Sequence, residues 1–84
     1  GSVVYLALGS LALKSIETYL KDTGDFEAPL RFSHGGKKIL PSGKLLICSY
    51  HPSQQNTFTG KLTQPMFDSV FTEIRRYLHE SEQA

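Results

Sequence analysis

The side chains of this protein that are best suited to chemistry lie in one polar stretch, from position 50 to position 63. The stretch gathers hydroxyl and amide side chains around one imidazole, one lysine and the aromatic rings of Tyr50 and Phe58. Hydroxyls and main-chain N–H groups are donors that proteins use to hold a phosphate backbone. The composition therefore favours a loop that wraps a phosphate backbone while His51 meets the ligand.

Phe58 is the one large apolar side chain between positions 53 and 61, and two interpretations of it stay open. An exposed aromatic ring on a polar loop can act as a wedge or as a stacking platform for bases. The same ring can instead fold back on the core.

Two buried strands are predicted to position this loop. The run KLLICS at 44–49 indicates one of them, and it must end at His51, because Pro52 removes a backbone donor and disfavours helix for the residue before it. The run VVYLAL at 3–8 indicates the other. Between positions 24 and 43, four glycines and two prolines predict mostly loop, with one or two short strands near 30–32 and 39–40.

Two amphipathic helices complete the pattern. Ser10 is suited to cap the first, and Gly24 ends it. Thr63 is suited to cap the second, whose first turn accepts Pro65. The order strand, helix, short strands, strand, helix predicts an α/β fold in which strands 3–8 and 44–49 are parallel. His51 then lies at the carboxyl end of a strand, where open α/β sheets bind ligands.

The net charge of +1 is an average over unlike segments. Positions 28–64 carry five basic residues and no acid, whereas the flanks sum to −4. Such asymmetry is typical of a surface that binds a polyanion, but lysines in loops also serve solubility, and both interpretations stay open. The basic residues are Arg31, Lys37, Lys38, Lys44 and Lys61.

Composition excludes several classes of protein. One Cys among 84 residues excludes a disulfide framework and a four-thiolate metal site made by this chain alone, and Cys48 fits a buried strand as a core residue. We expect no metal site in the chain. No apolar run approaches the ~20 residues that span a bilayer, so we expect no membrane partner. No secretory leader is visible, and Gly1 and Ser2 are as easily an expression scar as native sequence.

Three groups of residues resemble motifs of the uracil-DNA glycosylase superfamily, most closely of its bacterial and archaeal iron–sulfur branches. His51-Pro52-Ser53, with Asn56, Thr59-Gly60 and Leu62-Thr63 after it, is similar to the family's second active-site motif. Positions 6–10 look like the strand-to-helix turn that precedes this motif, and His34-Gly35 resembles a further His-Gly element. The resemblance covers positions 3 to about 71.

The resemblance implies a DNA repair enzyme that hydrolyses the N-glycosidic bond of a flipped-out uracil or a related deaminated base. His51 is implied as the catalytic donor to the uracil carbonyl, and Ser53 as a phosphate ligand. The most familiar branch of the family places an apolar residue soon after this Ser, but Gln54, Gln55 and Asn56 stand there in this sequence, so the residue that wedges into DNA stays open between these amides and Phe58. The implied DNA-contacting residues are Ser53, Gln54, Gln55, Asn56, Thr57, Phe58, Thr59, Lys61 and His34.

The family's first motif, which positions the attacking water, and its four cluster cysteines have no counterpart here. We therefore expect positions 1–84 to be one domain, the C-terminal half of a glycosylase-like domain, with a frayed tail at 81–84 and little activity alone. The complete fold is expected to be a three-layer α/β/α sandwich with a parallel central sheet. Expected partners are uracil-containing DNA and the missing N-terminal half, in a cytoplasmic, nucleoid-associated protein. No cofactor is expected in this chain, although a [4Fe–4S] cluster is possible in the parent.

Other interpretations stay open at this point. The chain can be a non-catalytic nucleic-acid-binding module that keeps the phosphate loop, or a structural fragment without a partner. His51 and His34 can be turn residues. An acyl-transfer role for Ser53, with His51 as its base, lacks the Gly-flanked turn and an orienting acid that such chemistry needs.

Overall fold

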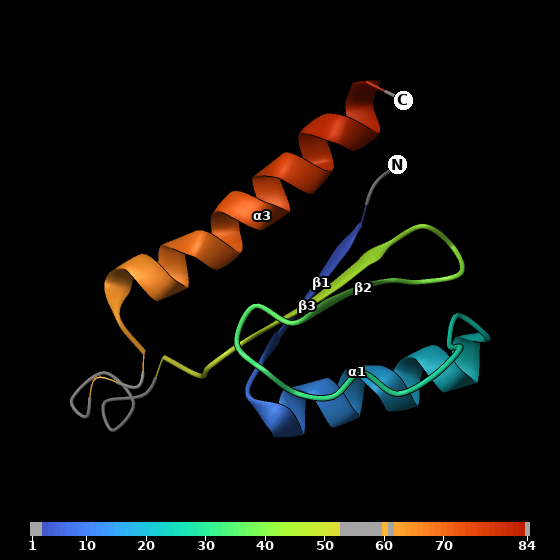
Figure 1. Cartoon of the computed structure of the whole chain (residues 1–84). Coiled ribbons are helices and arrows are strands. Elements are labelled where there is room, and N and C mark those ends of the chain that lie inside the picture. Colours follow the sequence, from blue (N-terminus) through green and yellow to red (C-terminus); the bar gives the residue numbers. More distant parts are fainter. Residues whose placement is uncertain (1–2, 53–59, 61, 84) are drawn as a thin grey trace.

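Three strands and two helices make up the computed structural model, which describes residues 3–52, 60 and 62–83. In chain order they are β1 (Val4–Leu8), α1 (Ser10–Thr23), β2 (Lys37–Ile39), β3 (Leu45–Ser49) and α3 (Gln64–Gln83). The chain is therefore mixed α/β, with one helix on each side of a small sheet (Figure 1).

The sheet has the strand order β1-β3-β2. Strands β1 and β3 are parallel, in a register that runs from Val4 opposite Leu45 to Leu8 opposite Ser49, which confirms the predicted pairing. All five residues of β3 are buried, and its near-continuous apolar sequence is typical of a strand that is covered on both faces.

The third strand runs against the other two. β2 pairs with β3 antiparallel, with Lys37 opposite Ile47. The turn between them is closed by hydrogen bonds between the backbones of Leu40 and Lys44 (2.8 Å) and of Gly43 and Leu40 (2.8 Å). So short a connection permits only an antiparallel return, because a parallel crossover needs about a dozen residues. The described sheet is thus mixed, and a parallel central sheet is not confirmed.

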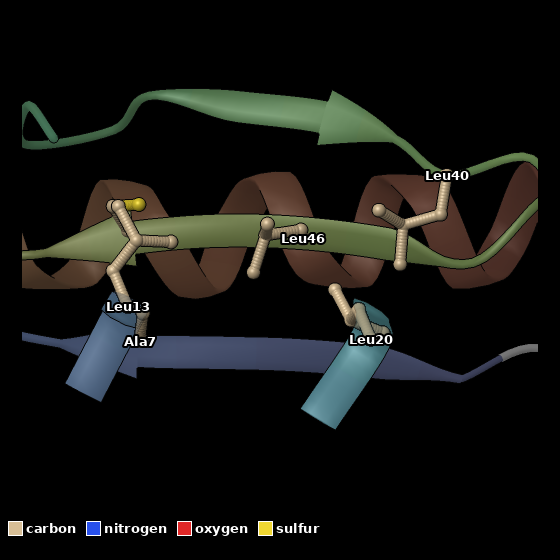
Figure 2. Packing of buried hydrophobic residues seen from close by; sticks show 6 residues of the cluster. Ala7, Leu13, Leu20, Leu40 and Leu46 are labelled. Carbon is tan, nitrogen blue, oxygen red and sulfur yellow. The ribbon is translucent and has the colours of Figure 1, made fainter. Parts of the chain in front are cut away.

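Helix α1 covers one face of the sheet. Its buried Leu13 and Leu20 pack in one cluster with Leu46 of β3, as Figure 2 shows. The buried residues of this cluster are Ala7, Leu13, Leu20, Leu40, Leu46 and Cys48. Helix α3 covers the opposite face, where Val70 packs against Leu45 and Ile47. Successive residues of β3 thus serve opposite faces, as the pleat of a strand requires.

The helix starts differ in how well the sequence predicts them. Thr63 behaves as predicted, since its Oγ1 accepts the Met66 N–H at 3.3 Å. Ser10, in contrast, is the first helical residue, and the N-cap is Gly9, which has a φ of 91° and makes no side-chain cap. Only glycine adopts this backbone conformation readily. The sharp turn from β1 into α1 therefore decides the cap, and the prediction for Ser10 is wrong.

Candidate functional site

His51 lies beyond the carboxyl end of β3, where its side chain is exposed. The neighbouring parallel strand turns into α1 at the same edge of the sheet, and the Gly9 N–H donates to the Ser49 carbonyl at 2.9 Å. A Cβ atom on Gly9 would lie 3.7 Å from the Cβ of His51. The carboxyl ends of β1 and β3 thus form one edge that carries His51 beside the strand-to-helix turn.

His34 is brought to the same edge of the sheet. Its Nδ1 accepts the Tyr50 N–H at 3.1 Å, and its Nε2 lies 2.8 Å from the Met66 carbonyl oxygen. Its ring also stacks on the Tyr50 ring, with 5.0 Å between centroids and 28° between planes. His51 follows Tyr50 directly in the sequence. The fold brings His34, which is 17 positions before His51, into contact with the same Tyr50.

Most of the predicted DNA contacts lie outside the described residues, and they stay predictions. They are Ser53, Gln54, Gln55, Asn56, Thr57, Phe58, Thr59 and Lys61. On the β3 side of this connection the described residues end at Pro52, and on the α3 side they begin again at Leu62. Gly60, between these two, is also described. Leu62 is 3% exposed, so the chain is again fixed to the core before α3 begins.

In the described part of the chain, two of the basic residues of positions 28–64 are hydrogen-bonded to acceptors of the chain itself. Lys37 donates to the Glu73 carboxylate at 2.6 Å, and Lys38 donates to the Ala28 carbonyl at 3.0 Å. Lys44 precedes β3, at the end of the strand opposite to His51. At ~3.3 Å per residue, β3 separates these two ends by roughly 15–20 Å. A charge count along the sequence could not show this separation.

Cys48 is fully buried in the α1 cluster, as predicted for a core residue. Burial raises the pKa of its thiol, the Glu17 carboxylate raises it further, and a hydrogen bond with the Ser33 backbone opposes both. A thiol with a raised pKa is a poor nucleophile and a poor metal ligand at neutral pH. Across residues 3–52, 60 and 62–83, no three His, Cys, Asp or Glu side chains come together as a metal site.

A groove between β2 and α3, with a volume of about 430 Å³, was not predicted from the sequence. Glu73, which lines this groove, accepts a hydrogen bond from Lys37. This hydrogen bond and the charge of the lysine lower the pKa of Glu73. Tyr77 packs beneath Leu45 and Ile47, and its hydroxyl donates to the Gly43 carbonyl. The spacing of Tyr77 from the buried stripe of α3, seven residues after Val70, is the signal that could have found it.

The described part of the chain contains no helix that is both long and apolar enough to cross a membrane.

The fold and the position of His51 define a class: an α/β protein with a histidine at the carboxyl ends of two parallel strands, the edge at which open α/β sheets bind ligands. No family model matches the chain. It is similar, however, to the type-5 uracil-DNA glycosylase of Thermus thermophilus, with 44% identity over 73 residues, which cover 87% of this chain and 32% of that protein.

The type-5 uracil-DNA glycosylases of two mycobacteria are similar too, each with 50% identity over 46 residues, or 55% of this chain. Those residues cover 20% of the Mycobacterium leprae protein and 17% of the Mycobacterium tuberculosis protein. These similarities confirm the resemblance to the uracil-DNA glycosylase superfamily. It spans about a third or less of the length of these relatives.

Proposed function

We propose that this chain is the C-terminal half of a uracil-DNA glycosylase domain and that it supplies the group which stabilises the departing base. The observation that carries the proposal is the placement of His51, exposed at the shared carboxyl edge of β1 and β3, next to Gly9. The identity of 44% with a protein named as a uracil-DNA glycosylase supports the same conclusion.

The chemistry follows from where charge develops. The target nucleotide must leave the base stack before its glycosidic bond can be reached. When that bond breaks, the leaving uracil carries negative charge on its carbonyl oxygens. A hydrogen-bond donor fixed at that position stabilises the transition state, and one such donor contributes roughly 10²- to 10³-fold in rate. His51 is that donor in our proposal, and a neutral imidazole N–H is sufficient for the role.

The DNA contacts belong to the connection that begins at Pro52. In our proposal Ser53 holds a phosphate next to the flipped nucleotide, and the residues after it enter the minor groove at the vacated site. Gln54, Gln55, Asn56 and Phe58 are candidates for the wedge, while Thr57, Thr59 and Lys61 contact the backbone.

The partner that completes this half-domain is the remainder of the same fold. Among the described residues, β1 has β3 as its only neighbouring strand, so its outer edge has room for another strand. Val3, just before β1, is 41% exposed. A strand from the N-terminal half would extend the sheet here and give the three-layer sandwich with a larger parallel portion. We place the whole protein in the cytoplasm, at the nucleoid.

An iron–sulfur cluster does not fit the residues of this chain. A [4Fe–4S] cluster needs four ligands, usually thiolates, and the only thiol here is the buried Cys48, whose pKa is raised. If the parent protein carries a cluster, its ligands come from other parts of that protein, and no step above depends on it.

The test grafts this chain into a working enzyme. A chimaera of the Thermus thermophilus protein, in which this chain replaces the matching segment, is assayed on a labelled duplex with one uracil. We expect uracil release by the chimaera, a loss of ~10²- to 10³-fold in His51→Leu, and partial retention in His51→Gln, which keeps an N–H donor. The chain alone should release no uracil. Robust turnover by the chain alone would refute the half-domain proposal, and full activity of His51→Leu would refute the role of His51.

The alternative is a non-catalytic nucleic-acid-binding module, which the hydroxyl-rich stretch after His51 also supports. Gel shifts at two salt concentrations separate the candidates. A glycosylase half prefers duplexes with uracil or an abasic site, and a general module binds matched duplexes equally well. Binding that is absent at low salt would contradict both.

A further inference from the structure

His34 lies between the two ends of the connection that follows β3. Its Nδ1 accepts a hydrogen bond from the backbone N–H of Tyr50, the residue just before His51, at 3.1 Å. Its Nε2 lies 2.8 Å from the carbonyl oxygen of Met66, in the first turn of α3. One imidazole thus joins the end of the central strand to the start of the second helix.

The chemistry of the two partners assigns the proton on this ring. A backbone N–H can only donate, so Nδ1 must carry a lone pair, and a carbonyl can only accept, so Nε2 must carry the hydrogen. Both bonds can exist together only in the neutral tautomer that is protonated on Nε2. With both nitrogens engaged by the main chain, neither is left to bind a phosphate while the two bonds hold.

The position of His34 is itself fixed by a tight turn. The Gly36 N–H donates to the Ser33 carbonyl at 3.0 Å, and Gly35 has a φ of 79°, as the third residue of a type II turn requires. The turn is bound to β3, because the Gly35 N–H donates to the Cys48 carbonyl and the Cys48 N–H donates to the Gly36 carbonyl, both at 2.8 Å. His34 therefore projects from a segment that is hydrogen-bonded to the strand carrying His51.

We propose that His34 is a positioning residue for His51. It holds the Tyr50 peptide against the start of α3 and so fixes both the place from which His51 projects and the span of the DNA-contacting connection. The inference rests on the proposed function for its effect on DNA, but the paired hydrogen bonds can be tested without DNA. It assigns His34 a role other than the direct DNA contact that the sequence predicts.

Three substitutions of His34 separate its two bonds. His34→Asn places an amide oxygen near the position of Nδ1 and can still accept the Tyr50 N–H. His34→Gln places an amide nitrogen near the position of Nε2 and can still donate to Met66. His34→Phe keeps a stacking ring and loses both bonds. Leu40→Ala is the control: it removes a buried side chain at the other end of the sheet and leaves both bonds in place.

The first readout is nitrogen NMR of the wild-type chain at a pH where the imidazole is neutral. We expect Nδ1 of His34 to be bare, Nε2 to carry the proton, and the Tyr50 amide to exchange slowly with solvent. A proton on Nδ1 overturns the proposal, and this measurement needs no variant that might fail to fold.

The second readout compares the variants at a temperature where each is fully folded. We expect His34→Phe to shift the imidazole resonances of His51 and to weaken binding to an abasic-site duplex on the order of 10-fold, which corresponds to the loss of one or two neutral hydrogen bonds. His34→Asn and His34→Gln should each recover part of both effects, and Leu40→Ala should show neither. Unchanged His51 resonances in His34→Phe overturn the positioning role. If the wild-type chain binds no DNA but the tautomer and the His51 shifts are as expected, the proposed function fails and the positioning role stands.

Discussion

Replacing Gly9 by alanine should destabilise the protein through backbone strain and not through a clash. Gly9 has φ 91° and ψ 162°, a combination that is essentially confined to glycine. The added Cβ would meet the His51 Cβ at 3.7 Å, which is an ordinary van der Waals distance. The cost is therefore that of the backbone conformation alone, about 1–3 kcal/mol.

Gly24 offers a matched control at the other end of α1. It has φ 83° and ψ 4°, the left-handed helical conformation, and nothing lies within 4 Å of an added Cβ. Non-glycine residues adopt this conformation at a cost of about 1 kcal/mol. Gly24→Ala should therefore be the milder of the two changes, although both positions have room for the methyl group.

Urea titrations of the two variants, followed by circular dichroism, give the comparison. With an unchanged m-value, the midpoint should fall further for Gly9→Ala than for Gly24→Ala. Only Gly9→Ala should disturb the His51 resonances, because the Gly9 N–H also binds the Ser49 carbonyl at 2.9 Å, two residues before His51. Equal costs for the two variants, or a loss below ~0.5 kcal/mol for Gly9→Ala, would refute the assignment of strain to this turn.

Three further predictions concern the core and the surface. Leu46→Ala, at a side chain only 2% exposed, should lower the free energy of unfolding by roughly 2–5 kcal/mol in the same titration, and Leu11→Ala, on the surface, should change it little. Cys48 should react with iodoacetamide only as fast as the chain unfolds, because its thiol is buried. Since the pKa of this thiol is raised in the folded chain, the free energy of unfolding should also fall as the pH rises above about 9.0, where the unfolded thiol ionises. Rapid alkylation under native conditions would contradict this burial. Lys37 lowers the pKa of Glu73, so this pair stabilises the fold above pH 4.5, and the stabilisation is lost as the pH falls through the lower pKa of the folded state. The melting temperatures of wild type and Glu73→Gln should therefore differ at pH 7 and converge in acid.

Sequence patterns predicted the part of the fold that depends on local and nearest-neighbour information. The apolar runs at 3–8 and 44–49, with a helix after the first, predict a parallel pair of strands, and Pro52 predicts that the second strand ends before it. Thr63 was predictable for the same reason, since a capping hydroxyl acts within one turn of chain. The antiparallel pairing of β2 with β3 was harder to predict, because the glycine-rich segment before β2 has little hydrophobic periodicity.

What the sequence could not predict are contacts that depend on where the irregular segments return. His34 precedes Tyr50 by 16 positions and Met66 by 32, and no spacing rule links the three. Their contact depends on the turn at Gly35 and Gly36, which hydrogen-bonds to Cys48 and delivers the imidazole to the end of β3. Tyr77 illustrates the same limit, since its hydroxyl donates to the carbonyl of Gly43 in the turn between β2 and β3.

Both local sequence rules and long-range contacts determine the position of His51 at the edge of the sheet. Local rules place His51 at the carboxyl end of β3, but an exposed residue after a strand end is free to take many positions unless its backbone is held. Here two hydrogen bonds among those of the described residues hold the backbone before His51: the Gly9 N–H donates to the Ser49 carbonyl, and the Tyr50 N–H donates to His34. Catalysis by a donor that must meet a developing charge depends on such preorganisation, because a displacement of about 1 Å can cost ~10²-fold in rate. Gly9 and His34 touch neither DNA nor base in this proposal, yet substitutions at either should affect turnover through the placement of His51.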